Sequence, residues 1–200
     1  AATWQHHRTV AALIDGGPES GIHRSTDGGE TWTRLTEGLP EGNMGKIGLA
    51  ISPQRPDVLY AAIELDNRTG GVWRSTNRGA TWEKRSDAVA GATGPHYYQE
   101  LYASPVNPDL LYQMDVFLHV SRDGGFTWTN ISAGLPDNLW VSRVQASAHE
   151  KGRVYAALNG YRWDDFTPYL YVSEDYGQNW TAIGIDFAIV VIGVYVGIEV

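Results

Sequence analysis

The chain has 200 residues, of which 23 are acidic and 15 are lysine or arginine, so its formal net charge is −8. This surplus of acid excludes the basic face on which nucleic-acid binding depends, and we expect no nucleic-acid partner. The sequence has no cysteine, which excludes disulfides and thiolate metal sites. No cluster of spaced histidines and carboxylates replaces them, so we expect no metal and no cofactor.

An eight-residue segment recurs four times along the chain, at intervals of 46 to 52 residues. Each copy follows the pattern Ser-x-Asp-x-Gly-x-Thr-Trp, and we call each copy a box. The boxes occupy residues 25–32, 75–82, 121–128 and 173–180. A second motif, which ends in a tyrosine, lies about midway between boxes, at residues 52–60, 104–112 and 147–155. A short third motif covers residues 37–40 and 133–136.

Each repeat unit contains four short strand candidates separated by turn residues, and no stretch shows sustained helical periodicity. In the second unit these candidates are residues 46–51, 58–63, 72–75 and 81–85. A period of this length with four strands per unit indicates a β-propeller blade. We therefore predict an all-β propeller of about four antiparallel, four-stranded blades. Strands A to D run outward from the central channel, and each C–D turn carries a box.

The boxes divide the chain into predicted blades. Residues 1–37 form a partial blade, and residues 38–86, 87–132 and 133–183 form three further blades. The apolar residues 184–200 are predicted to supply strands that close the ring, because an open ring would expose sheet edges. Asp186 and Glu199 interrupt this segment, and its length is at the lower limit for crossing a bilayer. We therefore expect buried strands here and no membrane span.

The repeated pattern of each box has a structural explanation. The aspartate, or asparagine, accepts hydrogen bonds from backbone N–H groups of its own turn. The glycine provides a positive φ without steric cost. The tryptophan is large enough to fill the wedge between neighbouring sheets. The residues expected to act in this structural way are Asp27, Trp32, Asn77, Trp82, Asp123, Trp128, Asp175 and Trp180.

This pattern resembles the Asp-box, also called the bacterial neuraminidase repeat. Families that share it include sialidases, xyloglucan-cleaving glycoside hydrolases, sortilin-type receptor domains and a photosystem assembly factor. The sequence at residues 21–32 and 52–60 is most similar to that of bacterial sortilin-like repeat proteins that are often labelled glycosyl hydrolases. Two boxes depart from the pattern, with Asn77 and Arg78 in place of Asp-Gly and Asn179 in place of Thr. The resemblance implies a propeller, and we expect a secreted or periplasmic protein.

The ligand face of such a propeller is expected opposite the boxes, where the B–C and D–A loops lie. The predicted B–C loops are residues 15–20, 64–71, a short turn at 115, and 159–168. The last of these is the longest, and its Tyr161 and Trp163 can stack on a sugar ring or pack on a protein. The candidate catalytic carboxylates on these loops are Asp66, Asp115, Asp164 and Asp165.

The D–A loops and inner strands add further candidates for ligand binding. His96, Tyr97 and Trp140 lie on D–A loops of the same face. Glu100 and Arg143 share one register on adjacent inner strands, near the channel. They either pair with each other across the channel, or Arg143 holds an anionic ligand group.

Two classes of function remain open on the sequence alone. The first is a binding or scaffold propeller that presents its aromatic face to a glycan, a peptide or a protein. The alternative is a glycoside hydrolase, xyloglucanase-like or sialidase-like, or a non-functional fragment of one. Glycosidases generally need two carboxylates, about 5 Å apart for retention and about 6.5–9.5 Å apart for inversion. Whether the chain is an enzyme therefore depends on carboxylate geometry that the sequence does not contain.

Overall fold

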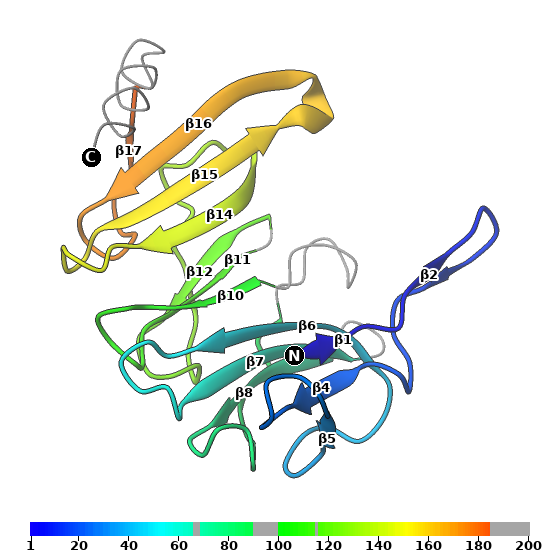
Figure 1. The fold of residues 1–200 in the computed structure, drawn as a ribbon. Helices are drawn as coiled ribbons and strands as arrows, with labels where there is room; N and C mark the ends of the chain where they lie inside the picture. The colour runs from blue at the N-terminus through cyan, green and yellow to red at the C-terminus, as the bar shows by residue number, and fades with distance from the viewer. Residues whose placement is uncertain (66–68, 90–99, 115, 185–200) are drawn as a thin grey trace, which may run out of the picture.

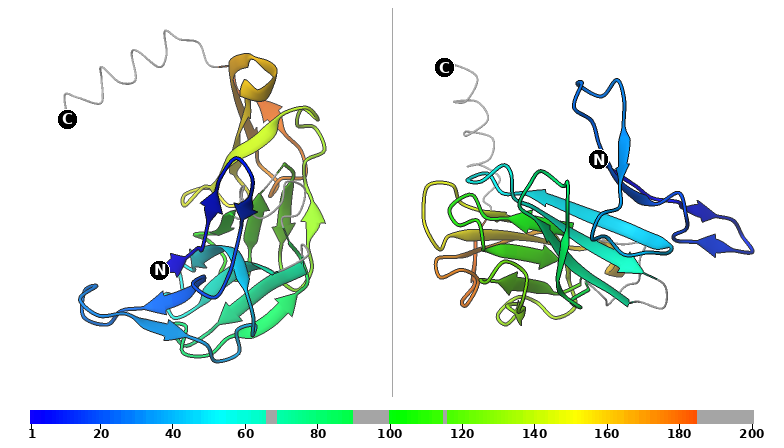
Figure 2. Two further views of the ribbon diagram at one scale, coloured as in Figure 1. Left: turned by 90° about the vertical axis from the view of Figure 1, so that its right-hand side faces the viewer. Right: turned by 90° about the horizontal axis from the view of Figure 1, so that it is seen from below.

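The computed structural model describes residues 1–65, 69–89, 100–114 and 116–184. Four antiparallel sheets follow one another in chain order around an open crescent (Figures 1 and 2). We number these sheets blade 1 to blade 4. The described residues contain one single-turn 3-10 helix and no α-helix, so the predicted all-β class is confirmed.

Blade 1 has three strands and an additional hairpin. Its sheet, in spatial order, consists of β1 (Ala2–Thr3), β4 (Gly21–Arg24) and β5 (Thr33–Leu35). Between β1 and β4 the chain makes a separate hairpin, which projects away from the crescent (Figure 1). The strands of that hairpin are β2 (His7–Arg8) and β3 (Leu13–Ile14).

Blades 2 to 4 each have four strands in simple up-and-down order. Blade 2 consists of β6 (Met44–Ile51), β7 (Leu59–Leu65), β8 (Thr69–Ser75) and β9 (Glu83–Ser86). Blade 3 consists of β10 (Glu100–Ala103), β11 (Leu111–Met114), β12 (Leu118–Ser121) and β13 (Thr129–Asn130). Blade 4 consists of β14 (Trp140–Ala146), β15 (Val154–Gly160), β16 (Asp165–Ser173) and β17 (Thr181–Ala182).

Three hydrophobic cores lie between successive blades, because alternate residues of each strand face opposite neighbours. Ile22 of blade 1 packs with Ala61 and Trp73 of blade 2. Between blades 2 and 3 the core contains Tyr60, Ala62, Leu101, Ala103 and Leu111. The largest core joins blades 3 and 4, with Tyr112, Leu118, Val120, Val144 and Ala156 among its members. The fold therefore depends on contacts between sheets as much as on the sheets themselves.

Each box closes a C–D turn through its own side chains, as predicted. In the first box, Asp27 Oδ1 accepts from the hydroxyl of Ser25 at 2.7 Å and from the backbone N–H of Thr31 at 3.0 Å. The Thr31 hydroxyl donates to Asp27 Oδ2, and the Ser25 hydroxyl accepts from the N–H of Gly29 at 2.8 Å. Boxes three and four repeat this set around Asp123 and Asp175.

The second box builds the same turn without a charge. Asn77 Oδ1 accepts from the Ser75 hydroxyl at 2.9 Å and from the Thr81 N–H at 2.9 Å. Its amide nitrogen donates to the Thr81 hydroxyl, which reverses the direction of the bond found with aspartate. The turn therefore needs a planar side chain with a suitably placed oxygen, and asparagine satisfies this requirement as well as aspartate does.

The box tryptophans pack toward the preceding blade in the chain. Trp82 is only 5% exposed in the core between blades 1 and 2. Trp128 Nε1 donates to the Ser86 hydroxyl of blade 2, and Trp180 Nε1 donates to the carbonyl of Ile131 in blade 3. Trp32 is 52% exposed, because no described blade precedes the first one. The predicted wedge role of the tryptophan is thus realised at each junction that the structure describes.

The first prediction concerns this wedge. Replacing Trp82 with alanine leaves a cavity between two blades and is expected to lower the free energy of unfolding by about 3–5 kcal/mol. Trp32→Ala is the matched control, because the same box position is half exposed there, and we expect a loss under about 1 kcal/mol. Urea unfolding followed by fluorescence or circular dichroism measures both. Equal losses for the two variants would contradict the wedge role.

The second prediction concerns acid stability. Hydrogen bonds from the Thr31 hydroxyl and backbone hold the pKa of Asp27 far below its usual range, and those from Asn179 lower the pKa of Asp175 to about 2. A carboxylate with a lowered folded pKa contributes stability above its unfolded pKa of 3.8, and this stability is lost as the pH falls toward 2. We expect Tm to hold down to about pH 4 and to fall below it.

Asp175→Asn tests the source of that fall, since Asn77 shows that the turn accepts an amide. The variant is expected to lose Tm less steeply than the parent between about pH 4 and pH 2. Asp137→Asn, at an exposed aspartate outside the boxes, is the control and should keep the parental slope. A parental slope in Asp175→Asn would assign the acid sensitivity to groups outside this box.

Candidate functional site

The B–C end of blade 4 is a hairpin rather than the long loop predicted for residues 159–168. Strand β15 continues to Gly160 and β16 begins at Asp165, and these two residues pair. Only the 3-10 helix η2 (Tyr161–Trp163) and Asp164, at φ 55°, form the turn. Pro168 fits inside β16 because it pairs with no residue of β15, where the register shifts, or of β17, so no partner needs an N–H at the proline. The loop prediction was wrong on this point.

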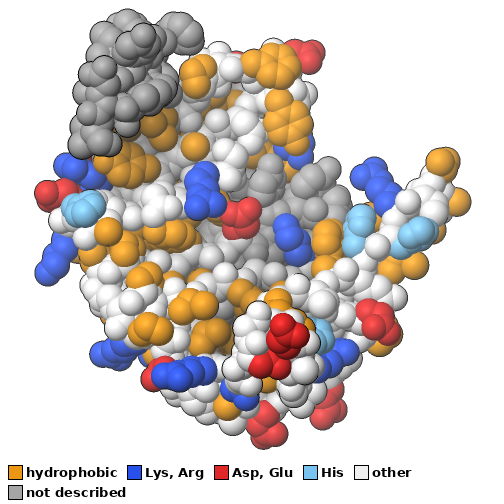
Figure 3. Space-filling view, viewed as in Figure 1, with side chains coloured by type: hydrophobic (Ala, Val, Ile, Leu, Met, Phe, Trp, Pro, Cys, Tyr) orange, Lys and Arg blue, Asp and Glu red, His pale blue; other side chains and the backbone are white. Residues whose placement is uncertain are grey.

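Aromatic side chains and one arginine stack at this turn. The guanidinium carbon of Arg162 lies 3.4 Å from the ring centroid of Trp140 and 4.7 Å from that of Tyr161. Trp163 Nε1 donates to the carbonyl of Asn138 at 3.0 Å, which ties the turn to the connection before β14. Tyr161 is nevertheless 47% exposed and Trp163 is 67% exposed. Hydrophobic side chains gather over this turn in the space-filling view, at the upper right (Figure 3).

Asp165 and Asp164 lie at the same turn in different settings. Asp165 Oδ2 accepts from the Tyr169 hydroxyl at 2.7 Å, and its Oδ1 accepts from the N–H of Thr167 at 3.0 Å. The Tyr169 hydrogen bond is the main cause that lowers the pKa of Asp165, and the same bond raises the pKa of Tyr169. Asp165 is therefore held as a carboxylate, which suits a base or nucleophile and does not suit a general acid. Asp164 occupies the left-handed turn position.

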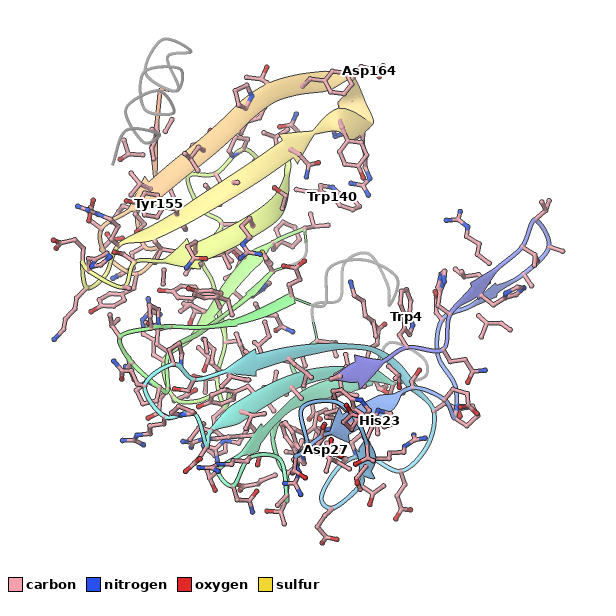
Figure 4. All side chains as sticks on the ribbon, in the orientation of Figure 1. Trp4, His23, Asp27, Trp140, Tyr155 and Asp164 are labelled. Carbon is pink, nitrogen blue, oxygen red and sulfur yellow. The ribbon has the colours of Figure 1, made fainter. Side chains whose placement is uncertain are left out.

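The N-terminal segment brings a second aromatic group to this face. The ring of Trp4 lies 4.3 Å from that of His6, and its Nε1 donates to the carbonyl of Asp15 at 3.2 Å. His6 Nε2 lies 3.8 Å from Asp15 Oδ1. Glu64, 3% exposed, lies near the B–C end of β7. Figure 4 shows Trp4 facing the opening of the crescent, with Trp140 and Asp164 across it on blade 4.

Glu100 and Arg143 remain separate. Glu100 begins β10, and Arg143 lies exposed on β14 opposite Ala157, after a bulge. The structure records no ion pair between them within the described ranges. Burial raises the pKa of Tyr102, and the nearby charge of Arg143 opposes that shift. The other role proposed for Arg143, contact with an anionic ligand group, stays a prediction.

Several predicted site residues lie outside the described residues. They are Asp66, His96, Tyr97 and Asp115. The same holds for residues 185–200, on which the predicted closure of the ring depends. These assignments stay predictions.

The sequence analysis missed Trp4 as a candidate. A usable signal was present, because four of the eight tryptophans belong to boxes and Trp73 lies in the strand core of blade 2. The remaining three are Trp4, Trp140 and Trp163, and all three belong to this face. A tryptophan outside the repeated positions therefore marks the candidate site better than a carboxylate does.

Within the described ranges, no group of three or more histidine or acidic side chains is placed to hold a metal ion. No helix there has the length and apolar character needed to cross a membrane.

The chain is similar to a known repeat family and to curated proteins. Residues 170–183 match the BNR-Asp box repeat family. Over 188 aligned residues the chain is 26% identical to a xyloglucanase of Hypocrea jecorina. The aligned region covers 77% of this chain and 22% of that protein. It is 27% identical to the oligoxyloglucan-reducing end-specific xyloglucanase of Emericella nidulans, over 82% of this chain and 21% of the relative. The chain thus spans about a fifth of the length of these curated relatives.

The fold of the chain is also similar to that of a solved xyloglucanase structure. The GH74 xyloglucanase from Xanthomonas campestris superposes with a TM-score of 0.59 at 25% identity, over 83% of this chain and 27% of that one. The likeness to sortilin-like proteins stays a prediction. The four boxes, the antiparallel blades and these likenesses together identify the chain as an Asp-box, or BNR-repeat, β-propeller protein.

Proposed function

We propose that the chain is a blade array of a carbohydrate-active propeller and that its B–C face binds a glycan. The observation that carries this proposal is the exposed pair Tyr161 and Trp163, held at the end of blade 4 by neighbouring side chains and backbone. An aromatic ring offers a flat apolar face to the C–H groups of a sugar ring, and its two side-chain torsions lose little entropy on binding.

The geometry at blade 4 further reduces the side-chain entropy that is lost on binding. Arg162 stacks between Trp140 and Tyr161, and the Trp163 indole is fixed by its bond to Asn138. The rings are therefore ordered before a ligand arrives, which lowers the cost of binding. Trp4 faces the same opening from blade 1, so a chain of several sugar units could contact both ends of the crescent (Figure 4).

The relatives indicate which glycan to test first. Both curated relatives described above are named for xyloglucan, so a neutral xyloglucan oligosaccharide is the first candidate ligand. Because a polymeric glycan of this kind lies outside the cell, the proposal includes an extracytoplasmic location. A peptide ligand would use the same aromatic face and is the alternative occupant.

Glycoside hydrolysis is the second candidate function, favoured by the likeness to xyloglucanases. Asp165 is held ionised and suits the base or nucleophile. Asp164, next to it, is the proposed general acid. Asp66 and Asp115 stay candidates for a carboxylate pair that includes residues outside the described ranges.

The third prediction tests the aromatic face. Trp163→Ala and Tyr161→Ala are each expected to weaken binding of a xyloglucan oligosaccharide about three- to tenfold, as the loss of one stacking contact implies. Phe126→Ala is the matched control, because Phe126 is a 49% exposed aromatic residue in the third box, stacked under Arg85. Isothermal titration calorimetry measures all three. Unchanged affinity in both face variants, or an equal loss in the control, would refute this site.

The fourth prediction tests hydrolysis in the same preparation. If the chain cleaves xyloglucan, Asp165→Asn is expected to lower kcat/KM by at least about a hundredfold, the lower end of a general acid–base contribution. Release of reducing ends measures the rate. Cleavage at the parental rate by Asp165→Asn and by Asp164→Asn would exclude both residues from the chemistry.

A further inference from the structure

The junction between blades 3 and 4 has a small groove at its B–C end, which we call the notch. It holds about 20 Å³, between the turn that precedes β12 and the connection from blade 3 to blade 4. Its lining is mostly apolar and includes Phe117, Leu135, Pro136, Leu139 and Leu158. A volume of this size admits one group about as large as a water molecule. The notch therefore suits one hydroxyl or hydroxymethyl group of a larger ligand.

Phe117 forms one wall of the notch and is also 45% exposed to solvent. It lies in the turn between β11 and β12, directly before Leu118. The N–H of Leu118 donates to the Ser132 hydroxyl at 2.9 Å, and its carbonyl accepts from the N–H of Ile131 at 2.8 Å. The backbone next to Phe117 is therefore tied to the outer part of its own blade. The exposed ring lies over the B–C end of the largest hydrophobic core.

Asp137 is the one charged residue in the lining of the notch. It is exposed and takes part in no ion pair with another described residue. A carboxylate only accepts hydrogen bonds, and its two oxygens can accept from two hydroxyl groups at once. It also repels an anionic ligand. The lining therefore suits a neutral ligand that is rich in hydroxyl groups.

Trp163, an aromatic residue on which the glycan proposal depends, is held at the margin of the notch. It is not part of the lining, but its indole donates to the carbonyl of Asn138 at 3.0 Å. Asn138 lies in the chain between Asp137 and Leu139, and both of these line the notch. Phe117 belongs to the B–C turn of blade 3 and Trp163 to that of blade 4. Packed sheets lie about 10 Å apart, so sugar units of one glycan chain can reach both turns.

We propose that the glycan site crosses this junction and has two stacking positions, Trp163 on blade 4 and Phe117 on blade 3. One sugar stacks on Trp163. Another sugar of the same chain stacks on Phe117, donates hydroxyl hydrogen bonds to Asp137 and places one exocyclic group in the notch. This inference rests on the proposed function and adds to it the path and the charge of the ligand, a neutral oligosaccharide that runs from blade 4 to blade 3.

Phe117→Leu tests the second stacking position. It keeps most of the apolar volume at the notch and removes the aromatic face, so the variant is expected to keep the parental Tm. Its affinity for a xyloglucan oligosaccharide, measured by calorimetry on the 200-residue chain, is expected to fall about three- to tenfold. Phe126→Leu is the matched control, because it makes the same change at a ring of similar exposure, 49%, in the third box.

The outcomes separate this inference from the proposed function. Parental affinity in Phe117→Leu, with affinity lost in Trp163→Ala, overturns the second stacking position and leaves the proposed function standing. Parental affinity in Phe117→Leu, Trp163→Ala and Tyr161→Ala overturns both. An equal loss in Phe126→Leu also overturns the second position, since the effect would then not belong to the notch.

The double variant Phe117→Leu with Trp163→Ala distinguishes two stacking positions from one. Contacts with different sugars act independently, so the fold losses of the two single variants are expected to multiply. A double variant that binds no more weakly than Trp163→Ala alone would put both rings at one position and overturn the path across the junction.

Asp137→Asn tests the hydroxyl contact. It is expected to weaken the same oligosaccharide at least about threefold, because an amide replaces one acceptor oxygen with a donor. Glu30→Gln, at an exposed carboxylate of the first box, is the matched control and should bind as the parent does. Parental affinity in Asp137→Asn overturns its role. Trilysine and an oligogalacturonate probe a cationic peptide and an acidic glycan, and tighter binding of either overturns the neutral oligosaccharide.

Discussion

The structure depends on the burial of large side chains in the wedge between neighbouring sheets. A single four-stranded sheet cannot bury its own faces, so each blade depends on packing against a neighbouring blade. The box turn places one tryptophan at the start of each D strand, and Trp82 shows how completely the preceding blade covers it. The hydrogen bonds around Asp27 and its equivalents set the direction of that tryptophan, so local turn chemistry and long-range packing act together.

The candidate sites follow from the same construction. The box end of the blades is occupied by turns whose polar groups are already bonded to one another. The B–C end is free of this constraint, and there the chain places Trp163 and Trp4 outside the repeated positions.

The repeat made the architecture predictable from sequence, because boxes and midway motifs are local signals with a fixed spacing. The strand candidates of blade 2 agree with β6 to β9 to within a few residues. The turn at residues 159–168 was predicted less well, since Pro168 indicates a loop unless the pairing of β17 is known. The buried Tyr112 hydroxyl, which has no hydrogen-bond partner among the described residues, was beyond sequence reasoning, because a partner depends on how two blades pack and not on either motif.

The separate hairpin of blade 1 has a consequence for folding kinetics. In blade 2, the turn between β7 and β8 joins Leu65 to Thr69, so this pair forms by closing a very short loop. In blade 1, Ala2 pairs with Ile22 only after the intervening chain, including the hairpin β2–β3, has been looped out. The entropy of loop closure grows with loop length, and a two-stranded hairpin has little stability of its own. Blade 2 is therefore expected to form before blade 1, and the amides of β1 are expected to exchange faster than those of β7 and β8.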